Sequence, residues 1–248
     1  MHHHDSAVPN YRQLMELQVR TLYRIDEAER LLCVNEEKSP PAPYFFGGRT
    51  PHGHVWRLRH DAPVALENEL AALCHAEPML DDLQAQTGAA GAVNLPLNYA
   101  AIKQLINRYW SVEAEWRGPA YFFPNNVVVS QPVVQIEQAN LHLAQGPFAW
   151  LHDEWRLVQP CMAWVEQGQV AAVCFSSRLS AGAAEAGVWT APEARGRGYA
   201  GVVVAAWAKA VQKDGRRPLY STSWDNLASQ AVARKLGLIC YGEDWNLR

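Results

Sequence analysis

The chain has 248 residues, of which 49% are hydrophobic and 19% are charged, and its formal net charge is −3. This composition is typical of a globular protein with a sizeable core, and the length suits one large domain or two small ones. The mild negative charge gives no general attraction to nucleic acid or to an anionic membrane, and no apolar run reaches the roughly 18–20 residues of a membrane span. No signal peptide is visible, so we expect a cytoplasmic protein.

Neither a disulfide framework nor a metal motif is visible in the sequence. The five cysteines are scattered, without a Cys-x-x-Cys pair, which predicts reduced and buried thiols. A loop carries His52, His54 and His60, followed by Asp61. Without further ligands at a suitable spacing, such a loop is typical of plain surface. We therefore expect no metal site.

The first part of the chain reads as helices separated by a loop and one strand. Residues 9–34 predict a single amphipathic helix, because apolar side chains recur at three- and four-residue steps. Residues 35–53 are rich in proline and glycine and predict a loop. The patterns that follow predict a strand at 55–59, a helix that begins at the N-cap Asp61 and runs to Cys74, and a third helix at 99–110.

The sequence pattern changes from mainly helical to strand-like near Gly118-Pro119, and this change marks the predicted boundary between two parts of the chain. Residues 1–118 would form an N-terminal α/β region, either a degenerate partner domain or a contribution to an acceptor site. Residues 119–248 would form the domain that carries the chemistry.

The second part reads as strands followed by alternating strands and helices, which implies a mixed α/β (α+β) sheet with helices on its faces. A hairpin is predicted at Gln167-Gly168, because glycine allows positive φ. The predicted strands are 121–123, 127–129, 133–136, 161–166, 170–177, 185–190, 219–223 and 239–244, and the predicted helices are 138–154, 199–211 and 226–236.

The stretch Glu185–Gly201, reading EAGVWTAPEARGRGYAG, predicts an anion site. It runs from a strand through a glycine-broken turn into a long apolar helix. The first-turn N–H groups of a helix have no intrahelical partner, and the helix dipole adds partial positive charge there. Gly196 and Gly198 let the backbone approach a phosphate, and Arg195 and Arg197 supply charge. The alternative is an exposed basic turn.

Two motifs in this half resemble those of the GNAT superfamily, the acyl-CoA-dependent N-acetyltransferases. Arg195-x-x-Gly198-x-Ala200 is similar to the R/Q-x-x-G-x-G/A signature. Asn226-x-x-Ser229, followed by Lys235-Leu236-Gly237-Leu238, is similar to the second motif of the family. The resemblance covers roughly residues 120–248 and implies the GNAT fold there, with acetyl-CoA as the co-substrate.

The resemblance also implies which residues bind the cofactor. The pantetheine would pair with the backbone of the 188–190 strand, and the pyrophosphate would lie on the amides of the following turn. The residues implied to bind CoA are Val188, Trp189, Thr190, Arg195, Gly196, Arg197, Gly198, Tyr199, Ala200, Gly201, Asn226 and Ser229. For Tyr199 the alternative is packing, and for Asn226 and Ser229 it is helix capping.

Glu185 is the candidate general base. It lies ten residues before Arg195, where some family members carry a base glutamate, and partial burial there would raise its pKa. The alternative is a solvated carboxylate at a strand end. The usual acid, a tyrosine seven residues after the motif asparagine, is replaced by Ala233. Ser229, Tyr220 and Tyr241 remain as candidates, or the thiolate leaves without help, since a free Cys thiol has a pKa of about 8.5.

Three functions fit these patterns. The first is transfer of an acetyl group from acetyl-CoA to the primary amine of a small molecule, by a monomer or homodimer. The second, suggested by the missing tyrosine, is a non-catalytic acyl-CoA-binding or regulatory module. The third is acyl transfer to a protein or aminoacyl acceptor. The charge balance argues against tRNA, because phosphate contacts need clustered Lys and Arg.

Overall fold

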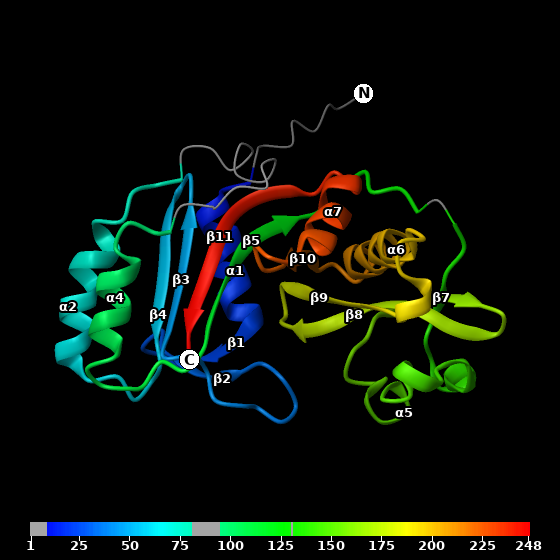
Figure 1. Cartoon of the computed structure of the whole chain (residues 1–248), viewed down its shortest axis with the longest axis horizontal. Helices are drawn as coiled ribbons and strands as arrows, with labels where there is room; N and C mark the ends of the chain where they lie inside the picture. The colour runs from blue at the N-terminus through cyan, green and yellow to red at the C-terminus, as the bar shows by residue number, and fades with distance from the viewer. Residues whose placement is uncertain (1–8, 81–94, 130) are drawn as a thin grey trace.

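A computed structural model describes residues 9–80, 95–129 and 131–248. Groups of strands and helices follow one another along the described residues (Figure 1). The helices are α1 (Tyr11–Leu22), α2 (Val64–His75), α4 (Tyr99–Ile106), α5 (Leu151–Glu154), α6 (Tyr199–Lys213) and α7 (Leu227–Lys235), with 3₁₀ turns η1 (Gln138–Leu143), η2 (Gly146–Phe148) and η3 (Pro192–Ala194). The strands are β1 (Tyr23–Ile25), β2 (Leu31–Val34), β3 (Phe45–Thr50), β4 (Gly53–Leu58), β5 (Glu115–Phe122), β6 (Val134–Gln135), β7 (Cys161–Glu166), β8 (Gln169–Leu179), β9 (Ala183–Thr190), β10 (Arg217–Ser221) and β11 (Ile239–Leu247).

One mixed sheet organises the described residues. Its nine strands run in the order β4-β3-β11-β5-β10-β9-β8-β7-β6, and a separate hairpin joins β1 to β2. Only β9 and β10 pair in parallel; the other neighbours are antiparallel. The predicted fold class, a mixed sheet with helices, is therefore confirmed. Strands β3 and β4 join the same sheet as β7–β9, and the predicted boundary at 118/119 falls inside β5.

Helices cover both faces of this sheet, because successive side chains of a strand point to opposite faces. On β9, Ala183 packs in the core that α1 covers, and its neighbour Ala184 packs in the core beneath α6 and α7. On β3, Phe46 faces α1, and Phe45 faces α2 and α4. The sheet thus has an α1 face and an α6/α7 face, which puts two separate surfaces around β9 and β10.

The helix predicted over 9–34 is wrong beyond Leu22. Tyr23 already has extended dihedral angles, and β1 turns back to pair with β2. The Asp26 carboxylate accepts a hydrogen bond from Arg30 N–H at 2.9 Å, which stabilises the turn between them. Tyr23 packs edge-on against Phe46 of β3. The pairing that ends the helix comes from tertiary contacts, which the helical periodicity of the sequence could not reveal.

The predicted loop 35–53 contains β3, a fully buried strand. Gly47 allows close packing, because a Cβ at this position would lie only 2.6 Å from the Trp245 ring. The helix predicted over 138–154 is broken into η1, η2 and α5 at Gly146-Pro147, where Gly146 has a φ of 55°. The proline there lacks a backbone N–H donor.

Two further predictions, the cap of α2 and a strand at 127–129, differ from the structure. Asp61 does not cap α2: Pro63 is the N-cap residue, and the Asp61 carboxylate binds Arg59 at 2.7 Å. The strand predicted at 127–129 is irregular backbone. In the part of the chain that the structure describes, no helix combines the length and the hydropathy that crossing a membrane would require.

Candidate functional site

The site begins where β9 and β10 stop pairing. Their parallel ladder joins Arg217 to Ala183 and ends at Leu219 and Glu185. β9 continues beyond this point to Thr190, and β10 ends at Ser221. The edge of β9 from 186 to 190 that faces away from β8 is therefore not covered by β10. Such an edge can accept an extended ligand as an added strand.

A turn with two left-handed glycines follows β9 and opens α6. Gly196 has a φ of 76° and Gly198, the N-cap residue of α6, has a φ of 85°. L-residues rarely adopt these angles, which explains the glycines at these positions. A Cβ built on either residue would meet no protein atom within 4 Å. The space beside the first turn of α6 is therefore open to a ligand, although the Gly201 N–H already donates to the Gly198 carbonyl at 3.1 Å.

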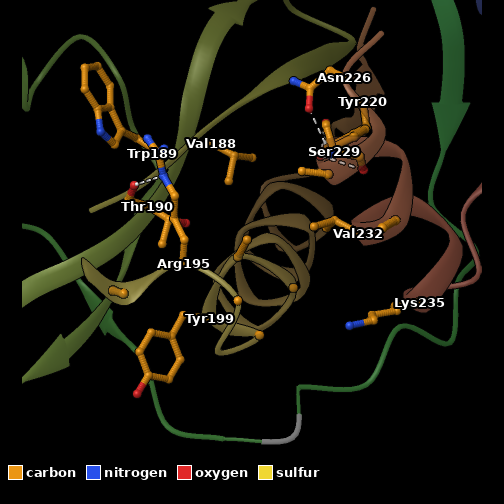
Figure 2. A pocket seen from close by; sticks show the side chains of 17 residues that line it. Val188, Trp189, Thr190, Arg195, Tyr199, Tyr220, Asn226, Ser229, Val232 and Lys235 are labelled. Atoms are coloured by element: carbon orange, nitrogen blue, oxygen red, sulfur yellow. Dashed lines mark hydrogen bonds between the residues drawn. The ribbon is translucent and has the colours of Figure 1, made fainter. Parts of the chain in front are cut away.

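A cleft of about 510 Å³ lies between the end of β9, the start of α6, and α7. Figure 2 shows its walls, with Val188 and Trp189 on one side and Ser229 and Val232 on the other. This volume lies in the range of small-molecule sites, about 300–1,000 Å³. Most of the residues predicted to bind CoA line it: Val188, Trp189, Thr190, Arg195, Gly196, Gly198, Tyr199, Ala200, Gly201, Asn226 and Ser229.

Arg197 is the predicted CoA ligand that does not line this cleft. Its guanidinium binds both carboxylate oxygens of Glu166 on β7, at 2.6 and 2.5 Å. The Tyr199 hydroxyl donates to the same carboxylate at 3.0 Å, and the Arg197 guanidinium lies 4.9 Å from the Tyr199 ring centre. The structure therefore gives Arg197 a partner on the protein itself.

Lys235, which the sequence analysis did not select, lines the cleft instead. It is the last residue of α7, and Figure 2 shows its side chain reaching toward α6. A lysine in the last turn of a helix is common, because it offsets the helix dipole. Only the tertiary packing of α7 beside the start of α6 reveals that this cation borders the same space as the glycine turn.

Asn226 and Ser229 form the opposite wall. The Asn226 side chain caps α7 by accepting a hydrogen bond from Ser229 N–H at 3.0 Å, so the capping alternative for Asn226 is realised. The Ser229 hydroxyl lies 2.6 Å from the Tyr220 hydroxyl, and both residues line the cleft. Burial raises the pKa of Tyr220 to about 12. Of the three candidates for the general acid, Ser229 and Tyr220 thus lie together.

Tyr241, the third candidate, lies on the other face of the sheet. It is fully buried in the core that α1 covers, and its hydroxyl donates a hydrogen bond to Gln18 Oε1. Burial raises its pKa well above the ordinary value. It does not line the cleft. Ala233, at the position of the usual tyrosine, is part of the core beneath α6 and α7.

Glu185 stands at the point where the ladder ends. Its side chain is almost completely buried, with 4% of the residue exposed. The backbone N–H and the hydroxyl of Ser221 both donate to Oε1, each at 2.7 Å, and Oε2 is buried without a hydrogen-bond partner. Burial raises the pKa of Glu185 to about 7, while the hydrogen bonds from Ser221 oppose the rise. The alternative of a solvated strand-end carboxylate is therefore wrong.

The cleft combines an uncovered strand edge with a place for an anion. Over the described ranges, no group of three or more His, Cys, Asp or Glu is arranged to hold a metal ion. The uncovered edge of β9, the glycine turn and Lys235 instead offer an extended-ligand site continuous with an anion site. Glu185, whose pKa lies near neutrality, is the β9 residue at which the ladder ends; it does not line the cleft, and by the alternation of β9 its side chain points to the α1 face of the sheet.

Comparison with protein families gives one match. Residues 162–243, which include β8–β10, the glycine turn, α6 and α7, match the family model of the GNAT acetyltransferases. The match contains both motifs of the sequence analysis. Comparison with curated proteins gives no match.

The comparison with solved structures gives several proteins that are described as GNAT-family or GCN5-related acetyltransferases. A GCN5-related N-acetyltransferase-like protein from Streptococcus suis is 15% identical over 84% of this chain and 85% of its own, with a TM-score of 0.48. A GNAT acetyltransferase from Colwellia psychrerythraea is 16% identical over 78% and 76%, with a TM-score of 0.46. A GNAT-family protein from Novosphingobium aromaticivorans is 21% identical over 55% of this chain and 66% of its own, with a TM-score of 0.45.

Proposed function

Because residues 162–243 match the family model of the GNAT acetyltransferases, we propose that the protein transfers an acetyl group from acetyl-CoA to the primary amine of a small molecule. The observation that carries this proposal is the position of Glu185. Its buried carboxylate lies where β9 and β10 separate, directly before the uncovered edge of β9. A proton acceptor at the end of an acyl-CoA path is what direct attack by an amine requires.

The donor would bind along the cleft. The backbone of 188–190 would hydrogen-bond the pantetheine as an added strand, and the first turn of α6 would hold the pyrophosphate. Lys235 and Arg195, at the two sides of the cleft, would supply positive charge. This arrangement directs the thioester toward the region where the two strands part.

Glu185 would act as the general base. An amine attacks only as the neutral form, and most of it is protonated at neutral pH. With a pKa of about 7, the ionised Glu185 can take one proton from the incoming ammonium group, directly or through Ser221 or a water molecule. The free Oε2 atom has no competing hydrogen bond in the described part of the chain. The neutral amine then forms the C–N bond to the thioester carbonyl.

The hydroxyl pair of Tyr220 and Ser229 would assist the leaving group. As the C–S bond breaks, the electron pair passes to sulfur, and the second amine proton is available to form the thiol. Full proton transfer from Tyr220, whose pKa is about 12, to a thiolate of pKa about 8.5 is uphill. We therefore assign Tyr220 a hydrogen bond to the thiolate. The balance is one ammonium and one thioester giving one amide, one thiol and one proton.

The test is a pair of measurements on wild type and Glu185→Gln. Calorimetry with acetyl-CoA measures donor binding, and thiol release with a panel of primary amines measures turnover. We expect both proteins to bind acetyl-CoA equally, and kcat to fall by about 10²–10⁴-fold in the variant. Glu193→Gln, a change at an exposed carboxylate beside the same turn, is the control. Acetyl-CoA that fails to bind, or an unchanged kcat in Glu185→Gln, would overturn the proposal.

A further inference from the structure

A second cavity lies on the α1 face of the sheet, separate from the cleft beside α6. Its volume is about 270 Å³. It is bordered by the end of α1, the first residues of β1 and β5, the end of β10 and the last residues of β11; Figure 1 shows the C-terminal end of β11 beside β1. The lining residues that matter here are Tyr23, Ala114, Trp116, Ser221, Asp244 and Arg248.

Ser221 connects this cavity to Glu185. It lines the cavity, and its hydroxyl donates to Glu185 Oε1 at 2.7 Å. Glu185 itself is packed behind it, with Oε2 buried and unpartnered. A molecule in the cavity would therefore lie one side chain away from the candidate base. The cleft beside α6 and this cavity approach the end of the β9–β10 ladder from opposite faces of the sheet.

Asp244 is the second carboxylate of this region, and it lines the cavity directly. Only 1% of the residue is exposed. Gln18 Nε2 donates to Asp244 Oδ1 at 3.1 Å, and Tyr241 donates to the oxygen of the same Gln18 amide. Because the Tyr241 hydroxyl occupies the amide oxygen, the amide nitrogen must face Asp244. The chain Tyr241–Gln18–Asp244 thus sets the orientation of the carboxylate.

Neither Glu185 nor Asp244 forms an ion pair with a cation among the described residues. Arg178 is the cation that acts on Glu185 from a distance, and its own partner is Glu36. Arg248, a cation that lines the cavity, donates to the neutral amide oxygen of Asn246 at 3.2 Å, and Glu115 is paired with Lys103 at 2.9 Å. Burying carboxylates without a counter-charge is unfavourable, so a bound cation would stabilise both.

We propose that this cavity is the acceptor site, and that the acceptor is a small primary amine whose ammonium group binds Asp244 and reaches Glu185 through Ser221. The inference rests on the proposed function and deepens it, because it names the surface and the carboxylate that would select the amine. Asp244 binds the cation, and Gln18 and Tyr241 are positioning residues. Tyr23 and Trp116 provide aromatic walls, which suit a cation or an apolar body. The volume suits a molecule smaller than a drug.

Three variants test the inference. Asp244→Asn removes the ionisable carboxyl group with little change of shape. Ala114→Trp fills the cavity from an exposed position, where no buried contact is lost. Glu113→Trp is the matched control, since Glu113 is exposed, adjoins Ala114 and does not line the cavity. Circular dichroism and thermal unfolding check that each variant folds.

Binding is measured first, without acetyl-CoA, by saturation-transfer NMR. The probes are butylamine, 1,4-diaminobutane and phenethylamine, with butanol and phenethyl alcohol as neutral analogues. We expect at least one amine to bind wild type more tightly than its alcohol, and Asp244→Asn and Ala114→Trp to weaken it by about tenfold or more. Glu113→Trp should bind as wild type does. Absence of binding by every amine overturns the inference, and so does binding by Asp244→Asn and Ala114→Trp that is as tight as binding by wild type.

Kinetics then separates this inference from the proposed function. We expect Asp244→Asn and Ala114→Trp to raise the amine KM by about tenfold, while the KM for acetyl-CoA stays unchanged. Turnover that persists with an unchanged amine KM in Ala114→Trp would refute the cavity as acceptor site and leave the acetyltransferase proposal intact. Amine binding without any turnover would refute the acetyltransferase proposal and leave the cation site standing.

Discussion

The carboxylate of Glu185 on β9 accepts two hydrogen bonds from Ser221 on β10, one from its backbone N–H and one from its hydroxyl, each at 2.7 Å. These bonds bridge the two strands directly after their parallel ladder ends. They favour the ionised carboxylate, while burial favours the neutral acid, and burial is the larger effect. The resulting pKa of about 7 leaves both forms populated near neutral pH.

Ser221→Ala should shift the pH dependence of acetyl transfer. The variant loses one donor to the charged form of Glu185, so the pKa of Glu185 should rise further, by about one unit. The acidic limb of the kcat/KM profile should move up by the same amount, so that the loss near pH 6 is about ten times the loss near pH 9.

Ser177→Ala is the control for this shift. The Ser177 hydroxyl also bonds Glu185, but it donates to the backbone carbonyl at 3.1 Å and not to the carboxylate. Its removal should leave the profile where it is. An identical profile in Ser221→Ala and wild type would contradict Glu185 as the base.

Glu185→Gln should reduce the pH dependence of folding stability. The pKa of Glu185 rises from 4.5 to about 7 on folding, so its contribution is fully present below 4.5 and is lost as pH rises through 7. Over that window the loss is up to about 3 kcal/mol. Urea unfolding near pH 5 and pH 8 should show a smaller decrease in Glu185→Gln than in wild type. An equal decrease in both proteins would show that Glu185 does not titrate in this window.

Gly198→Ala should weaken the binding of acetyl-CoA. Gly198 has a φ of 85° and lines the cleft, so a Cβ there disturbs the turn that would hold the pyrophosphate. Gly215→Ala is the matched control, because Gly215 follows α6 with a φ of 77° and does not line the cleft. Both changes should lower stability by about 1 kcal/mol. Only Gly198→Ala should raise the calorimetric Kd, by about tenfold; equal Kd values would count against this turn as the phosphate site.

Lys235→Gln should weaken acetyl-CoA binding in a salt-dependent way. Lys235 lines the cleft, and we expect the Kd to rise about three- to tenfold at low ionic strength and less at high ionic strength. Arg197→Gln should change the Kd by less than about twofold, because Arg197 is held by Glu166 outside the cleft. The opposite ranking, with Arg197→Gln the more damaging change, would show that Arg197 leaves Glu166 to bind the phosphates.

The sequence by itself determined the elements whose signals are local. Strand β9, the glycine turn and the start of α6 follow one another within a short stretch, and positive φ, a helix start and an apolar run can be recognised there residue by residue. The same holds for the Asn226 cap of α7 and the turn at Gln167-Gly168, where both residues have positive φ. These are the elements that carry the family motifs.

Only the tertiary structure decided what lies on each face of the sheet. Glu185, Ser221 and Asp244 come from three strands, and Gln18 comes from a helix at the other end of the chain; strand pairing and the docking of α1 bring them together. The face to which Tyr241 points depends on its strand's register beside β5, which no local pattern encodes. The burial of Glu185, and with it its pKa near 7, has the same origin, because desolvation is produced by the packing of segments far apart in the sequence.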